Sequence, residues 1–156
     1  MTQRTVIHAT FVIERTYDAP PARVFAAWAS RDAKAQWFGE LDKPADGYEL
    51  DFRVGGHEVS SGAFEDGGVV YTYQGLYQEI VPDQRIALSY TMDMNETRIS
   101  LSLATVEFRP DGRKTRLTYT EMGAFFDGHD KPQFREQGTQ ELLNNLEAVL
   151  AREPVA

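Results

Sequence analysis

The chain has 156 residues and no cysteine, and its 24 acidic residues outnumber the 16 basic ones to give a net charge of −8. This charge disfavours nucleic acid and anionic membrane surfaces as partners, because both require clustered Lys and Arg. Without cysteine, neither a disulfide framework nor a thiolate metal site can form. No apolar run reaches the length of a signal peptide or a membrane span, so we expect a cytoplasmic protein without membrane insertion.

A chain of this length buries about 70% of its unfolded surface, and the sequence shows no internal repeat and no linker-like stretch. We therefore expect one domain over residues 1–156, with homodimerisation left open. Nine Phe, seven Tyr and two Trp residues indicate either a bulky core or a pocket lined by aromatic rings.

The first part of the chain predicts a strand followed by two short helices. Residues 10–17 are rich in β-branched and aromatic residues, as strands are, and Arg15 shares a face of this strand with its apolar residues. Asp18 is the expected cap of a helix that starts at two prolines. Ser30 is the expected cap of a second short helix, which ends near Trp37.

The middle of the chain predicts consecutive strands separated by turn residues, of which Pro110-Asp111-Gly112 is the strongest signal. Strands joined by tight turns must be antiparallel neighbours, because parallel strands need long crossovers. A loop rich in Gly and aromatic residues follows them, over residues 123–129. The expected strands cover residues 48–54, 57–65, 69–81, 85–94, 97–109 and 113–122.

A long amphipathic helix is expected over residues 131–152, with Asp130 as its cap and Pro154 ending it. Two features of its first half are unusual. Gly138 costs about 1 kcal/mol relative to Ala inside a helix, and Arg135 projects from the centre of the apolar arc. The order of elements predicts an α+β helix-grip fold, in which a curved antiparallel sheet of six to seven strands surrounds the C-terminal helix.

Several short motifs follow one another in a distinctive order. They are RTYDAP at residues 15–20, VF at 24–25 with Trp28, WF at 37–38, Gly55-Gly56, GLYQEIVP at 75–82 with RIAL at 85–88, and TRLT at 115–118. In this order they resemble the START-like superfamily known as SRPBCC, and within it the branch named after the C-terminal domain of the activator of the heat-shock-protein ATPase (AHSA-type). The resemblance implies a helix-grip fold of the birch-pollen-allergen kind, with a cavity between sheet and helix. It implies no particular reaction, because members range from lipid carriers to cyclases.

The sequence indicates no catalytic group and no metal site. The three histidines, His8, His57 and His129, lie on different segments without the spacing of metal ligands. His57 and Ser61 would be about 13 Å apart along a strand, too far to act as base and nucleophile. No phosphate loop, nucleophile elbow or dinucleotide fingerprint occurs. We therefore expect no metal, no cofactor and no covalent catalysis.

The space between the sheet and the last helix is the candidate site for a ligand. Tyrosine hydroxyls on an apolar wall are typical of ligand pockets, although a solid core with tyrosines at its edge would use the same residues. Arg15 would equally suit an ion pair with a sheet glutamate, at position 79, 107 or 121, and the head of Arg135 could instead reach solvent. The candidate contacts are Arg15, Trp37, Phe38, His57, Tyr71, Tyr73, Tyr90, Tyr119, Phe134, Arg135 and Gly138.

We expect this space to bind an apolar or amphipathic small molecule. Less than about 100 Å³ of free volume would exclude this, because ligand pockets run to about 300 Å³ or more. One alternative is an enzyme of cyclase or dehydratase type that uses His57, Tyr or Glu side chains as general acid and base. A buried carboxylate–His or Tyr–Arg pair facing the void would support it. The other alternative is a chaperone-interacting module that exposes an apolar patch or its outer sheet face.

Overall fold

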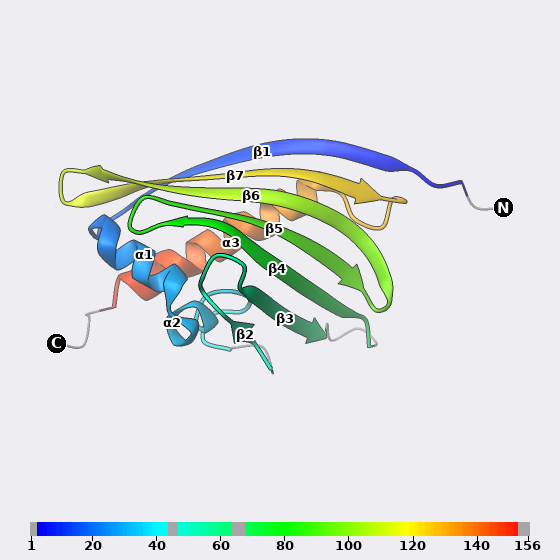
Figure 1. Cartoon of the computed structure of the whole chain (residues 1–156), viewed down its shortest axis with the longest axis horizontal. Helices are drawn as coiled ribbons and strands as arrows, with labels where there is room; N and C mark the ends of the chain where they lie inside the picture. Colours follow the sequence, from blue (N-terminus) through cyan, green and yellow to red (C-terminus); the bar gives the residue numbers. More distant parts are fainter. Residues whose placement is uncertain (1–2, 44–46, 64–67, 153–156) are drawn as a thin grey trace.

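The computed structural model describes residues 3–43, 47–63 and 68–152. Its strands form one sheet in the order β1-β7-β6-β5-β4-β3-β2, and every neighbouring pair is antiparallel. The sheet curves around the longest helix (Figure 1). The strands are β1 (Val6–Tyr17), β2 (Glu49–Leu50), β3 (His57–Ala63), β4 (Val70–Val81), β5 (Arg85–Met94), β6 (Thr97–Asp111) and β7 (Lys114–Phe126).

The helices are α1 (Pro21–Ala29), α2 (Arg31–Ala35) and α3 (Pro132–Leu150). α3 runs along the sheet, and α1 and α2 lie beside its C-terminal part at one end of the molecule (Figure 1). None of the helices in the described residues is long and apolar enough to cross a membrane. The predicted α+β helix-grip fold is confirmed. The core between helices and sheet is closed by fully buried side chains, among them Val24, Ile86, Val106, Leu117 and Leu146.

The largest differences from the predicted strands concern β2, the end of β7 and the start of β1, which begins at Val6 and not at residue 10. The expected strand 48–54 is reduced to Glu49–Leu50, because the chain then turns, with the Gly56 amide donating to the Arg53 carbonyl at 2.8 Å. β7 continues to Phe126, through part of the expected loop 123–129. It does so because β1 pairs with it over its whole length, as far as Val6 opposite Phe126.

The helix caps were predicted correctly only for α2. The Ser30 hydroxyl accepts a hydrogen bond from the Ala33 amide at 3.3 Å, as expected for a cap. Asp18 does not cap α1, because Pro20 occupies the N-cap position without a side-chain hydrogen bond. Since α1 begins at Pro21, Asp18 lies too far upstream.

The start of α3 also differs from the prediction. Lys131 is its N-cap residue, and it makes no side-chain cap bond. The carboxylate of Asp130 instead accepts hydrogen bonds from the Lys131 amide at 2.8 Å and from the Arg135 guanidinium at 2.9 Å. Pro154, the expected helix stop, lies outside the described residues.

Candidate functional site

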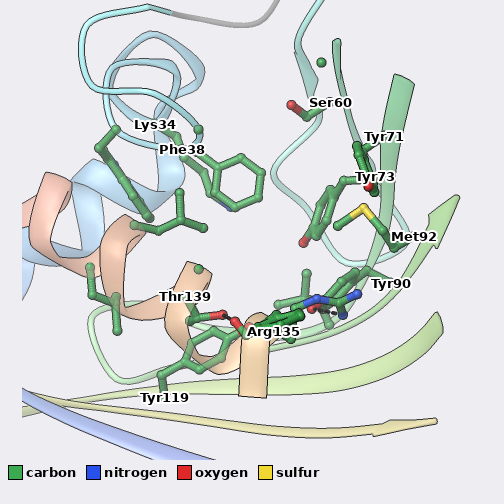
Figure 2. Close-up of a pocket in the computed structure, with 18 of the residues that line it drawn as sticks. Lys34, Phe38, Ser60, Tyr71, Tyr73, Tyr90, Met92, Tyr119, Arg135 and Thr139 are labelled. Atoms are coloured by element: carbon green, nitrogen blue, oxygen red, sulfur yellow. Dashed lines mark hydrogen bonds between the residues drawn. The ribbon is translucent and has the colours of Figure 1, made fainter. Parts of the chain in front are cut away.

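A cavity of about 350 Å³ lies between the sheet and the first half of α3. Residues of β3, β4, β5 and β7 form one side of it, and α3 and the α1–α2 region form the rest (Figure 2). This volume lies above the lower end of the range for ligand pockets, about 300 Å³. Most of the candidate residues line it, namely Trp37, Phe38, Tyr71, Tyr73, Tyr90, Tyr119, Phe134, Arg135 and Gly138.

The two halves of α3 differ in how they meet the sheet. In the second half, Leu143, Leu146 and Leu150 are buried in the core. In the first half, Gly138 leaves open space, because a Cβ atom added there would meet no heavy atom within 4 Å apart from the helix's own nearby backbone. No other element packs so closely against Gly138 that only glycine would fit there. It leaves the cavity wider than any larger side chain would.

Aromatic rings form the wall of the cavity along β4 and β5. The ring centroids of Tyr73 and Tyr90 lie 4.6 Å apart, and the ring of Phe38 stands edge-on to Tyr73 at 5.1 Å. Tyr73 lies over Gly75, where an added Cβ atom would come within 3.3 Å of its ring and of its hydroxyl oxygen. Glycine at this position thus gives the Tyr73 ring room. The Tyr73 hydroxyl points into the cavity (Figure 2).

Arg135 is directed into the protein, and its side chain is only 9% exposed. Its Nη1 donates to the Tyr90 hydroxyl at 2.9 Å and to the Glu121 carboxylate at 3.4 Å. Its Nη2 donates to the Ser100 hydroxyl at 2.8 Å and to the Asp130 carboxylate at 2.9 Å. These carboxylates compensate for a cation near a helix N-terminus, where the helix dipole disfavours it.

Glu121 is buried beneath Arg135 and is the centre of a hydrogen-bond network. It accepts from the hydroxyls of Tyr90 at 2.6 Å, Tyr119 at 2.8 Å and Ser102 at 2.8 Å. Burial lowers the pKa of Arg135, but its hydrogen-bond acceptors outweigh this effect and raise the pKa above its ordinary value. We call this group the Arg135 cluster; it comprises Arg135, Glu121, Asp130, Tyr90, Tyr119, Ser100 and Ser102.

A second buried charge cluster, which sequence reasoning missed, lies at the α2 end of the cavity. Lys34 and Glu58 are almost completely buried, and the Lys34 Nζ lies 2.8 Å from the Glu58 carboxylate. The hydroxyls of Tyr48 and Tyr77 donate to the same carboxylate. Burial lowers the pKa of Lys34, although Glu58 acts in the opposite direction. We call these four residues the Lys34 cluster. Lys34 also lines the cavity, with its Nζ 4.4 Å from the ring centroid of Phe38.

His57 does not line the cavity, contrary to the prediction. It is exposed, whereas Glu58 is buried and Ser60 lines the cavity two residues further along β3. Successive side chains of a strand point to opposite faces, so the prediction chose the wrong face by one residue. β3 has only one bulky aliphatic residue, Val59, so its sequence gives little indication of the buried face.

Arg15 also lies outside the cavity, contrary to the prediction. It shares a face with buried residues of β1, as expected, but β1 is an edge strand of the sheet. Its guanidinium donates to the Glu14 carbonyl at 3.2 Å and to the Asn144 side chain of α3 at 3.5 Å. The sheet glutamate at position 121, expected as a partner for Arg15, pairs with Arg135 instead.

The cavity therefore combines apolar rings with protonated hydroxyls. Burial, followed by the nearby glutamates, raises the pKa values of Tyr73, Tyr90 and Tyr119 above their ordinary value. These tyrosines remain hydrogen-bond donors at neutral pH. Within residues 3–43, 47–63 and 68–152, no group of three or more acidic or histidine side chains is placed to hold a metal ion.

Residues 18–151 match the family described as "Activator of Hsp90 ATPase homolog 1-like protein". The chain belongs to this family. The resemblance drawn from the motifs is thereby confirmed, including membership of the SRPBCC superfamily. None of the curated proteins compared with the chain matches it.

Solved structures show the family fold across a range of identities. An uncharacterised protein from Rhizobium leguminosarum is 46% identical with a TM-score of 0.93, over 97% of this chain and 100% of that one. The protein Mll3558 from Rhizobium loti is 49% identical with a TM-score of 0.84, over 93% and 99%. An AHSA1-like protein from Aeromonas hydrophila is 20% identical with a TM-score of 0.66, over 95% and 99%. The last similarity concerns the fold alone.

Proposed function

We propose that this protein binds an apolar or amphipathic small molecule in the cavity beneath the first half of α3. The observation that supports this most directly is the free volume of about 350 Å³ at Gly138, where a larger side chain would have filled the space. The wall is mostly aromatic and apolar, with a few placed polar groups, which is the usual composition of a small-molecule site.

The test is the binding of N-phenyl-1-naphthylamine, an uncharged probe that fluoresces strongly in apolar surroundings. The wild-type protein should bind it, and the Gly138→Leu variant should bind it at least about tenfold more weakly because leucine occupies the cavity. Stability should not fall, since replacing glycine inside a helix gains about 0.8 kcal/mol of helix propensity. Both tryptophans of the chain, Trp28 and Trp37, line the cavity, so their fluorescence reports binding independently.

Gln140→Leu is the matched control, because it adds leucine to an exposed position of the same helix. This variant should bind the probe as the wild type does. If Gly138→Leu lowers stability and probe affinity together, Gly138 is a packing position and the proposal loses its main support. The absence of probe binding by the wild type would refute it.

Catalysis in the same cavity is the alternative that the Tyr90–Arg135 pair would support. The Tyr90 proton, however, is donated to Glu121 at 2.6 Å, and burial together with Glu121 raises the pKa of Tyr90. A general acid or base works best with a pKa near the operating pH. We therefore propose binding without turnover as the function of this cavity.

A second candidate function, contact with a chaperone, is favoured by a separate surface. The outer face of the sheet exposes Val12, Leu101, Leu103 and Met122, each between 44% and 55%, and Leu103 lies directly opposite Met122. Exposed apolar patches often mark sites of protein contact. If this function holds, the protein should stimulate the ATPase of an Hsp90-type chaperone, and Leu103→Glu should abolish the stimulation. No stimulation by the wild type would rule it out.

A further inference from the structure

The charges that line the cavity are already paired within the protein. The single cation of the Lys34 cluster faces the single carboxylate of Glu58 at 2.8 Å. In the Arg135 cluster, two carboxylates, those of Glu121 and Asp130, lie within 3.4 Å of the guanidinium. A charge removed from water costs several kcal/mol unless it finds a partner. Each charged group of these clusters that could pair with a charge on a ligand therefore already lies beside an opposite charge of the protein.

An anionic ligand is disfavoured by the hydrogen bonds of Arg135. Guanidinium groups recognise carboxylates best through two parallel N–H bonds. Both terminal nitrogens of Arg135 already make two hydrogen bonds each, which is all that their hydrogens allow. The Arg135 cluster also carries one more negative than positive charge, so a carboxylate would be repelled.

A cationic ligand meets the opposite difficulty. Aromatic faces attract cations, but two of the rings in this wall are already engaged. The Lys34 Nζ lies 4.4 Å from the Phe38 centroid, and the Arg135 guanidinium carbon lies 5.6 Å from the Tyr90 centroid. A ligand cation would have to displace or approach these buried charges.

Two uncharged donors remain at the cavity: the buried Nε1 of Trp28, which has no hydrogen-bond partner among the described residues, and the hydroxyl of Tyr73. Among the described residues, none makes a hydrogen bond with the Tyr73 hydroxyl, and it points into the cavity (Figure 2). Burial and Glu58 raise its pKa, so that it keeps its proton. Ser60 lies directly opposite Tyr73 in the β3–β4 ladder and also lines the cavity. One edge of the cavity thus offers hydroxyls without charge.

We infer that the cavity selects an uncharged ring compound whose hydroxyl or carbonyl oxygen forms a hydrogen bond with the Tyr73 hydroxyl. This inference rests on the proposed binding function and adds the chemical class of the ligand. The aromatic wall, with the Tyr73 and Tyr90 rings 4.6 Å apart, favours ring systems because aromatic pairs gain energy beyond the burial of their area.

The experiment measures four naphthalene compounds by isothermal titration calorimetry at pH 7. They are 2-naphthol, naphthalene, the 2-naphthoate anion and the 2-naphthylmethylammonium cation. 2-Naphthol should bind most tightly, and both ions should bind at least about tenfold more weakly, because each ion must be buried without a free partner. Tyr73→Phe should weaken 2-naphthol binding about threefold to tenfold, as expected for one hydrogen bond, and should leave naphthalene unchanged.

Tyr17→Phe is the control for loss of a buried tyrosine hydroxyl. That hydroxyl donates to the Leu143 carbonyl at 2.9 Å and is not among the groups that line the cavity. The variant should keep the wild-type preference for 2-naphthol over naphthalene. Tighter binding of the naphthoate, or an unchanged preference in Tyr73→Phe, would overturn this inference while leaving the binding function intact. If neither these compounds nor N-phenyl-1-naphthylamine bind, the binding function itself fails, and the inference fails with it.

Discussion

The Lys34 cluster and the Arg135 cluster both bury a cation beside a glutamate at the wall of one cavity, but they share the charge differently. Lys34 has one carboxylate acceptor and one hydroxyl acceptor, Tyr77 at 3.4 Å, and both tyrosines of its cluster donate to that same carboxylate. Arg135 has two carboxylate and two hydroxyl acceptors. One of these, Asp130, has a side chain that is 21% exposed. A buried charge with several acceptors loses less stabilisation when any one acceptor is removed.

The two clusters also connect different elements. The Lys34 cluster joins α2 to β3 and β4. These strands lie near the edge of the sheet that ends in β2, a strand of only two residues. The Arg135 cluster joins the start of α3 to β5, β6 and β7, which are long strands with a neighbour on both sides. The first cluster therefore ties α2 to the edge of the sheet near β2, and the second ties the start of α3 to strands that are paired on both sides.

The largest predicted effect follows from breaking the Lys34 cluster. Glu58→Gln leaves the buried Lys34 ammonium without its counter-charge, and such changes cost about 3–5 kcal/mol. Urea unfolding should show a loss of this size. The double variant Glu58→Gln/Lys34→Met should regain most of it, because replacing a whole buried ion pair is often neutral or stabilising. A single variant with wild-type stability would mean that Lys34 is not charged in the folded protein.

A smaller effect is expected from Arg135→Met. Glu121 keeps three hydroxyl donors in this variant, and Asp130 can turn towards water, so the loss should be about 2 kcal/mol, typical of losing hydrogen bonds to a charged group. The matched control is Arg15→Met, which removes a guanidinium with two long contacts at the sheet edge. Its effect should stay within about 0.5 kcal/mol. A loss larger than that of Glu58→Gln would contradict the view that the Arg135 cluster shares its charge more widely.

The fold and the burial of Arg135 could be predicted from the sequence. Tight turns between strands required antiparallel neighbours, and the helical period of α3 placed Arg135 in the apolar arc, where it lies buried. The same helical pattern marked Gly138 as unusual, because glycine disfavours the interior of a helix. Both inferences were possible because a long helix has enough turns to show its period. The cavity lies between the sheet and the last helix, where the sequence analysis places the candidate site.

The Lys34 cluster could not be predicted in the same way. α2 has only five residues, too few to show a period, so that Lys34 looked like any surface lysine. β3 has one bulky aliphatic residue, Val59, so its alternation does not show whether the face of His57 or the face of Glu58 is buried. Edge segments with few apolar residues leave the choice of face open. In both places the partners, and not the local pattern, decide which side chain is buried.

The smallest effect expected concerns pH, and it separates the two cations. The pKa of Lys34 is lowered by burial, so between this lowered value and about 10.4 the unfolded chain binds more protons at this residue than the folded protein does. The stability contributed at this site therefore rises with pH across that window, by no more than about 1.4 kcal/mol per pH unit. The measurement is the difference in unfolding free energy between wild type and Lys34→Met from pH 7 to 10.5, with the difference between wild type and Arg135→Met as the control. The first should increase and the second should stay flat, since the raised pKa of Arg135 keeps it charged throughout. A flat first curve would mean that Glu58 and the surrounding rings hold Lys34 charged as firmly as the shared acceptors hold Arg135.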